Sequence, residues 1–301
     1  MSEETRMRAD DVIDEILEET GHITADDIVE EENTYSDIGV EDTSAVQEGE
    51  SQIQIRDLTK VYVRDDKETV AIENFSLDIK KGELISIVGP SGCGKTTILR
   101  MIAGLLDQTS GSITIEGRPC TGPGPDRGMV FQDFALLPWR TVRKNVELGL
   151  EIAGVPKEER RARAEKYLEI VGLENFADSR ISELSGGMKQ RVGIARALVN
   201  KPDVLLMDEP FGALDAQTRN IMQAGLIKIL AKTDQTIIFV THSVDEAVYL
   251  SDRIVVLTKR PAKIKEVIHI DWPRPRDRAS PEFTALRKHI LNELEKENVM
   301  N

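Results

Sequence analysis

The sequence predicts an α/β domain built on a largely parallel β-sheet. The run Leu84–Val88 is apolar apart from one serine, as in a strand buried on both faces of a parallel sheet. Val204–Met207 and Thr236–Val240 have the same character, and Ile254–Leu257 would add a further strand. Stretches with helical periodicity separate these runs. Because strands that alternate with helices usually lie parallel with helices packed against them, this order indicates the α/β class.

The segment before these strands predicts antiparallel β-structure. Apolar residues alternate with polar ones over Ile53–Leu58, which is typical of a half-buried strand. Val70–Ile72 and Phe75–Ile79 predict further strands beyond a charged turn at Arg64–Lys67. We therefore expect a hairpin at the start of the domain.

Helices are predicted in three places. The first is Thr96–Leu106, with Ile98, Ile102 and Leu105 on one face, and most of residues 141–200 has a helical pattern. The third begins after Ser280, a good N-cap, with Pro281 at the first helical position. Its expected buried face contains Phe283, Leu286, Ile290 and Leu294.

Charge divides the chain into two parts. The 301 residues contain 53 Asp and Glu against 39 Lys and Arg, a net charge of −14. Residues 1–52 alone hold 18 acids and two bases, so the rest of the chain is close to neutral. Low hydrophobicity with high charge predicts that residues 1–52 form a disordered acidic extension. A solvated tail and a docking or autoinhibitory arm both fit this composition.

Composition also excludes several classes of protein. The chain has no basic block, which disfavours a dedicated nucleic-acid binder. Its longest apolar runs are far shorter than the roughly 20 residues that span a bilayer, and the start lacks the pattern of a secretory signal. Cys93 and Cys120 are too few for a disulfide framework or a zinc site. We therefore expect an intracellular protein.

A phosphate-binding loop follows the predicted strand Leu84–Val88. The pattern G-x-x-x-x-G-K-[ST] is matched by Gly89, Pro90, Ser91, Gly92, Cys93, Gly94, Lys95 and Thr96. Glycines let backbone N–H groups turn around an anion, and the helix N-terminus adds its positive dipole end. Lys95 would face the β- and γ-phosphates, and the Thr96 hydroxyl would face Mg²⁺. Strand and helix lie where this motif requires them.

Cys93 lies inside this loop. Lys95 and the helix start would both lower its thiol pKa and make it reactive. A small residue that only fills space is the alternative interpretation.

Two carboxylates stand at the end of the predicted strand Val204–Met207. Ligands of open α/β sheets bind at the carboxyl ends of the strands, where Asp208 and Glu209 lie. Successive side chains of a strand point to opposite sides, so the two carboxylates have different roles. We expect Asp208 to hold Mg²⁺ and Glu209 to act as general base on a water.

Three more segments complete the pattern. Leu184–Gln190 places a serine and two glycines at the start of a helical stretch, a second anion site. Gln132 follows a short apolar run, and His242 follows the strand Thr236–Val240.

Together, in this order, these segments resemble the ATP-binding cassette (ABC) ATPase family, from residue 53 to about residue 260. In the family's terms they are the Walker A loop (residues 89–96), the Q-loop glutamine Gln132, the signature Leu184–Met188, Walker B Val204–Glu209, the D-loop Gly212–Asp215 and the switch histidine His242. Tyr62 matches the aromatic residue that stacks on adenine.

The resemblance implies a P-loop NTPase fold. It consists of a RecA-like core, an antiparallel β subdomain and a helical signature subdomain at about residues 139–190. The division of the chain would be an acidic extension (1–52), the ABC ATPase domain (53–260) and a C-terminal tail with a helix (261–301).

The resemblance also implies ATP and Mg²⁺ as ligands. Catalysis would fall to Glu209, His242, Lys95 and Gln132, and the metal would lie at Thr96, Gln132 and Asp208. The nucleotide-binding set would be Tyr62, Gly89, Pro90, Ser91, Gly92, Cys93, Gly94, Lys95, Thr96, Thr97, Gln132 and Asp208. Ser185, Gly186, Gly187 and Asp215 would reach the nucleotide of a second subunit.

One Walker A loop and one signature per chain imply a dimer, most simply a homodimer. The resemblance further implies transmembrane permease subunits, which would dock near residues 133–160 at the cytoplasmic face of the membrane, and indirectly a substrate-binding protein. No nucleic-acid partner is expected.

Met188 replaces the usual glutamine of the signature. With Met188 at this position, the signature looks like that of the ATPase subunits of importers for nitrate, sulfonates, taurine and bicarbonate. The segments Phe131–Trp139 and Trp272–Asp277 also look like that subfamily. A soluble cassette protein acting on ribosomes or DNA, an exporter subunit and a non-enzymatic nucleotide sensor are the alternatives. The sequence does not name the solute.

Overall fold

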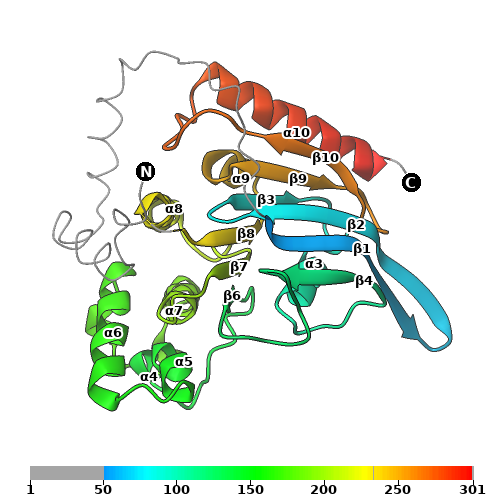
Figure 1. Ribbon diagram of the computed structural model, residues 1–301. Helices are drawn as coiled ribbons and strands as arrows, with labels where there is room; N and C mark the ends of the chain where they lie inside the picture. Colours follow the sequence, from blue (N-terminus) through cyan, green and yellow to red (C-terminus); the bar gives the residue numbers. More distant parts are fainter. Residues whose placement is uncertain (1–50, 233, 300–301) are drawn as a thin grey trace, which may run out of the picture.

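A six-stranded sheet forms the centre of the molecule in the computed structural model, which describes residues 51–232 and 234–299. Its strand order is β10-β9-β3-β8-β7-β6 (Figure 1). All neighbours pair in parallel except β10, which is antiparallel to β9. The strands are β3 (Leu84–Val88), β6 (Arg127–Val130), β7 (Val204–Asp208), β8 (Thr236–Val240), β9 (Arg253–Leu257) and β10 (Ile264–His269).

A second, antiparallel sheet has the order β2-β1-β4-β5. Its strands are β1 (Ser51–Arg64), β2 (Lys67–Lys80), β4 (Ser110–Ile115) and β5 (Arg118–Pro119). Apolar residues of β1 and β2 share one buried cluster with α3 (Lys95–Ile102) and with residues of β3, so α3 lies between the two sheets.

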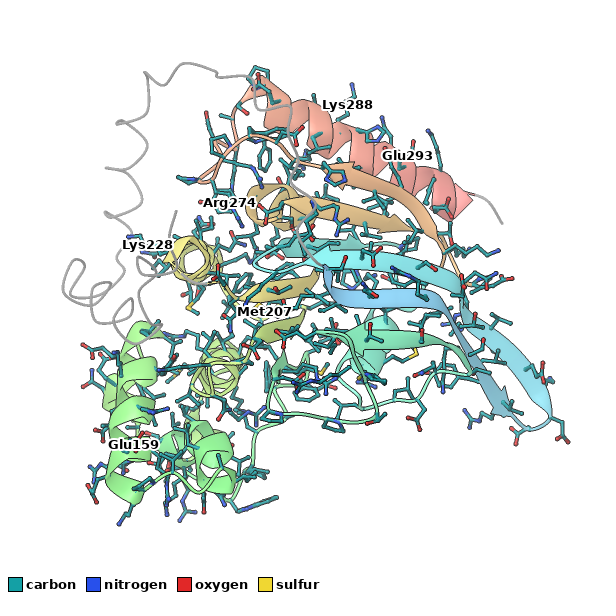
Figure 2. All side chains as sticks on the ribbon, viewed as in Figure 1. Glu159, Met207, Lys228, Arg274, Lys288 and Glu293 are labelled. Atoms are coloured by element: carbon teal, nitrogen blue, oxygen red, sulfur yellow. The ribbon has the colours of Figure 1, made fainter. Side chains whose placement is uncertain are left out.

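The remaining helices lie beside the six-stranded sheet or pack on one another. Those of the middle of the chain, grouped at the lower left of Figure 1, are α4 (Val142–Val146), α5 (Leu148–Ile152), α6 (Lys157–Ile170) and α7 (Gly186–Leu198), with short 3₁₀ turns at Glu174–Phe176 and Ile181–Glu183. The others are α8 (Ala216–Lys232), α9 (Val244–Leu250) and α10 (Pro281–Val299). They share buried clusters with the strands, as Met207 on β7 illustrates (Figure 2).

Most of the predicted elements are confirmed. Strands β3 and β8 have the predicted bounds, and all their residues are buried. The predicted face of α10 is also found, with Phe283 and Ile290 fully buried and Leu286 and Leu294 packed against the same cluster.

The helix predicted over Thr96–Leu106 is too long. Helix α3 ends at Ile102, because Gly104 takes a left-handed φ of +71° and a Cβ there would lie 2.2 Å from the backbone of Gly122. Leu105, predicted on the buried face, is therefore 48% exposed.

Two predicted strand segments form one strand. Val70–Ile72 and Phe75–Ile79 both belong to β2, whose pairing with β1 changes register near Leu58. The strands β4 and β10 were not anticipated. The predicted acidic extension lies outside the described residues, apart from the first two residues of β1.

Among residues 51–232 and 234–299, the structure contains no helix with the length and apolar character needed to cross a bilayer.

Candidate nucleotide-binding site

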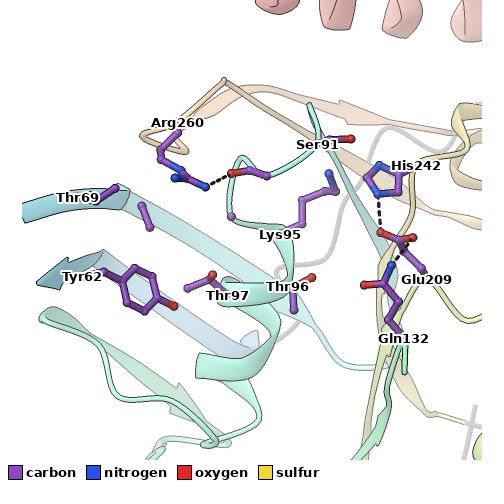
Figure 3. A pocket seen from close by; sticks show the side chains of 13 residues that line it. Tyr62, Thr69, Ser91, Lys95, Thr96, Thr97, Gln132, Glu209, His242 and Arg260 are labelled. Atoms are coloured by element: carbon purple, nitrogen blue, oxygen red, sulfur yellow. Dashed lines mark hydrogen bonds and ion pairs between the residues drawn. The ribbon is translucent and has the colours of Figure 1, made fainter. Parts of the chain in front are cut away.

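One edge of the six-stranded sheet carries the predicted site. The carboxyl ends of β3, β7 and β8 meet there, as parallel pairing requires. A cavity of about 320 Å³ opens at this edge. It is lined by Tyr62, Thr69, Ala71, Ser91, Gly92, Gly94, Lys95, Thr96, Thr97, Gln132, Glu209, His242 and Arg260 (Figure 3).

The glycine-rich loop between β3 and α3 has the shape of an anion cradle. Gly92 and Gly94 take φ values of +71° and +131°, which other residues rarely adopt. A Cβ on Gly94 would also lie 3.3 Å from the carbonyl oxygen of Ala71. Helix α3 has no side-chain cap at Gly94, so its first N–H groups face the cavity side without a side-chain acceptor. An anion would satisfy them.

Lys95 is the buried cation of this loop. Its side chain is only 5% exposed, and its ammonium donates to the carbonyl oxygens of Gly89 (2.7 Å) and Pro90 (3.0 Å). Phosphate oxygens are stronger acceptors because they carry charge. The lysine is therefore held within reach of the position where a bound phosphate would lie.

Asp208 lies behind the cavity at the end of β7. It is 2% exposed, and its carboxylate accepts a hydrogen bond from the Thr96 hydroxyl at 3.1 Å. Burial raises the pKa of Asp208 above its usual value, only partly offset by that hydrogen bond. A bound divalent cation would stabilise the buried, charged carboxylate of Asp208. Such cations prefer oxygen ligands, which Asp208 and Thr96 both supply. Among the described residues, no group of three or more His, Cys, Asp or Glu side chains could hold a metal ion, so a site here would need other oxygen ligands as well.

Glu209 is the centre of a three-residue group at the cavity wall. Its carboxylate accepts from the Gln132 amide at 3.1 Å and contacts His242 Nε2 at 2.5 Å (Figure 3). These residues follow β7, β6 and β8, so three separate strands position them. The backbone of Glu209 has a left-handed φ of +50° and its N–H donates to the carbonyl oxygen of Val240. A carboxylate held this way can accept a proton from a water in the cavity.

The predicted adenine-stacking residue also lines the cavity. Tyr62 on β1 is 42% exposed, and its ring lies 5.3 Å from the Lys60 ammonium. The open ring face is available to a base.

The signature residues lie elsewhere. Ser185 caps α7, accepting from the Met188 N–H at 3.2 Å, and Gly186 and Gly187 form the first turn. Asp215 precedes α8 and accepts from the Thr218 N–H. None of Ser185, Gly186, Gly187 and Asp215 is among the described residues that line the cavity. A role at this chain's own site has no support.

Gly89, Pro90 and Cys93 shape the loop without lining the cavity. Cys93 is 1% exposed, and burial raises its thiol pKa despite the nearby Lys95. The interpretation of Cys93 as a reactive cysteine is therefore wrong, because desolvation outweighs the positive charges. A Cβ on Gly89 would lie 3.0 Å from its sulfur, so Cys93 fills space within the loop.

Three lining residues were missed: Thr69, Ala71 and Arg260. Thr69 and Ala71 are ordinary strand residues of β2, and no sequence pattern marks them. Arg260 belongs to the loop between β9 and β10, and its guanidinium donates to the Gly92 carbonyl oxygen at 2.7 Å.

A phosphate loop with its lysine, a buried aspartate beside the threonine and a Glu–His pair at one sheet edge define a P-loop nucleoside triphosphatase. The family model described as "ABC transporter" matches residues 72–212. A relative named as an ABC transporter ATP-binding protein is 55% identical over 82% of this chain. The chain belongs to the ABC transporter family of ATP-binding, ATP-hydrolysing subunits.

Several relatives are close in sequence. An uncharacterized ABC transporter ATP-binding protein of Methanocaldococcus jannaschii is 55% identical, over 82% of this chain and 92% of its own length. A nitrate import ATP-binding protein of Synechocystis is 50% identical, over 73% of this chain and 83% of its own length. A bicarbonate transport ATP-binding protein of Synechococcus elongatus is 49% identical over 74% of this chain, but the match spans only 35% of that longer protein.

A solved structure confirms the fold. It is a dimeric ATP-binding cassette in a post-hydrolysis state bound to ADP and phosphate. It is 34% identical, superposes with a TM-score of 0.68, and the match covers 73% of this chain and all of that one.

Proposed function

We propose that this chain is the ATPase subunit of an importer for a small anion of the nitrate or bicarbonate kind, at the cytoplasmic face of a membrane. The names of two relatives at 50% and 49% identity support import of such solutes. Met188 in the signature points the same way, and sulfonates and taurine belong to the same range of solutes. The observation that carries the ATPase assignment is the convergence of Lys95, Glu209 and His242 on one cavity.

The phosphate end of ATP would be held by the loop and its lysine. On ATP entry, Lys95 exchanges the carbonyl oxygens of Gly89 and Pro90 for the β- and γ-phosphates. Thr96, Asp208 and Gln132 would hold Mg²⁺, which supplies positive charge against the phosphate oxygens when bound. Tyr62 stacks on the adenine.

Glu209, together with Gln132 and His242, would carry out the hydrolysis step. Glu209 accepts a proton from the attacking water, and His242, in contact with the same carboxylate, aligns the water with the γ-phosphate. Gln132 holds the other carboxylate oxygen and so keeps the base oriented. Because phosphoryl transfer needs mostly positioning and charge, these contacts would supply this chain's share of the catalytic site.

A second copy of the chain would complete each site. The predicted nucleotide set also contains four residues that do not line this chain's own cavity: Ser185, Gly186, Gly187 and Asp215. The dimeric state of the similar solved cassette supports a homodimer that closes on ATP. Ser185 and Gly187 would then donate hydrogen bonds to the γ-phosphate across the interface. Hydrolysis would break this bridge and let the dimer open.

The helical region would transmit this motion to a permease. Trp139 and Ile152 are 78% and 80% exposed, unusual for large apolar side chains. They belong to the predicted docking segment 133–160. A substrate-binding protein would deliver the solute to the permease.

Mixing two inactive variants tests the shared site. Lys95→Ala disables the phosphate loop, and Gly187→Asp places a negative charge on the signature facing the partner's γ-phosphate. We expect neither variant alone to release phosphate from ATP, and the mixture to regain activity, because a heterodimer has one intact site. A mixture as inactive as its components would refute the shared site.

A further inference from the structure

The loop between β9 and β10 places a second cation at the cavity. The guanidinium of Arg260 donates to the carbonyl oxygen of Gly92 at 2.7 Å, directly above the phosphate loop. Figure 3 shows Arg260 on the side of the cavity with Thr69, away from Glu209 and His242.

Most of the hydrogen-bonding capacity of Arg260 is unused. A guanidinium carries five N–H donors, and the carbonyl of Gly92 takes one of them. Within residues 51–232 and 234–299, no carboxylate forms an ion pair with Arg260. Its positive charge therefore faces a cavity that has the features of a site for a highly charged anion.

The backbone around Arg260 is held firmly. The Thr258 N–H donates to the Lys263 carbonyl oxygen and the Lys263 N–H donates to the Thr258 hydroxyl, each at 3.0 Å, which closes the loop. Ala262 joins it to β2, donating to the carbonyl oxygen of Ala71 at 2.9 Å. Little backbone freedom remains to be lost when Arg260 meets a ligand.

Helix α10 braces the same loop from the other side. Glu297 is 8% exposed and accepts from the Lys259 N–H at 3.0 Å. Lys265 on β10 donates to Glu297 at 2.8 Å and contacts Glu293 at 3.1 Å, and Glu293 is labelled on α10 in Figure 2. The C-terminal helix thus fixes the position from which Arg260 reaches the cavity.

We propose that Arg260 binds the nucleotide directly, through the α-phosphate and ribose. Lys95 and Thr96 serve the β- and γ-phosphate end, and Tyr62 serves the base, which leaves the intervening part of the nucleotide beside Thr69 and Arg260. A guanidinium can donate to a phosphate oxygen and a ribose hydroxyl at once. This inference rests on the nucleotide site proposed above.

The test compares nucleotides with a ligand that lacks both the α-phosphate and the ribose. Affinities for ATP, ADP and inorganic pyrophosphate, which has only enough phosphate for the β- and γ-positions, each with Mg²⁺, are measured by titration calorimetry for the wild type and Arg260→Gln. Lys263→Gln is the matched control, since Lys263 lies in the same loop but pairs with Glu73 at 3.1 Å, outside the cavity.

We expect Arg260→Gln to lower the affinity for ATP and for ADP by about tenfold, which is the effect of losing one charge-assisted hydrogen bond. Pyrophosphate affinity should be unchanged, as should every affinity of Lys263→Gln. Equal losses for all three ligands would show that Arg260 only supports the loop, and unchanged ATP and ADP affinities would exclude any role; either result overturns the inference. A wild type that does not bind ATP would overturn the proposed function and this inference with it.

Discussion

Replacing Glu209 by glutamine removes one function and leaves the geometry in place. Glutamine has nearly the same size, and its amide oxygen can still accept from Gln132. The left-handed φ of +50° is equally strained for both residues. The change therefore removes the carboxylate that accepts the proton, without opening a cavity.

The size of the effect follows from the role. A general base contributes roughly 10²- to 10⁴-fold to a rate, which corresponds to about 3–5 kcal/mol of activation free energy. ATP binding should not weaken, because Glu209 contacts Gln132 and His242 rather than the phosphate loop. We expect Glu209→Gln to bind ATP normally, to hydrolyse it at least about 100-fold more slowly and to accumulate as the ATP-bound dimer.

Phosphate release measures the rate, and size-exclusion chromatography with ATP measures the dimer. The control is Glu266→Gln, the same change at a half-exposed carboxylate on β10 that pairs with His289. Its rate should equal that of the wild type. Hydrolysis by Glu209→Gln within a few-fold of the wild type would refute the assignment of Glu209 as general base.

Three further substitutions and one labelling experiment test other residues of the chain. Lys95→Ala should lower ATP affinity by at least about tenfold in calorimetry, since a charged contact to phosphate is lost; equal affinity would exclude its role. Trp139→Ala should keep the ATPase activity of the isolated chain but lose co-purification with the permease, because the side chain is exposed. Cys93 should resist alkylation at pH 7.5 in the folded protein, because its raised pKa leaves little thiolate, and rapid labelling seen by mass spectrometry would contradict this. Arg276→Met should lower the free energy of unfolding by about 2–3 kcal/mol and Tm by about 5–10 °C, since this buried arginine donates to carbonyls at the end of α9; an unchanged melting curve would show that the contact is dispensable.

The predictions succeeded where local chemistry determines position. Strands β3, β7 and β8 are buried along their whole length, so their apolar runs stand out in the sequence. In a parallel sheet their carboxyl ends must meet at one edge. Lys95 and Asp208 were predicted from the motifs at these ends and His242 from the family resemblance, and the structure places all three at the same edge.

The predictions failed where contacts between residues far apart in the sequence determine the structure. Gly104 lies inside the helix predicted over Thr96–Leu106, and its close approach to Gly122, which ends the helix early, depends on the fold. Strand β10 has intermediate burial through most of its length and no clear alternation, so only its pairing with β9 defines it. Arg260 is a single cation in a loop, and only the fold places it above Gly92.

Isolation of the chain from its native membranes in mild detergent, followed by identification of the proteins that come with it, tests the importer assignment. We expect a polytopic permease and a solute-binding protein, and a small anion should bind to the latter. Co-purification with ribosomes or DNA, in the absence of any membrane protein, would contradict the transport function and leave the ATPase chemistry standing.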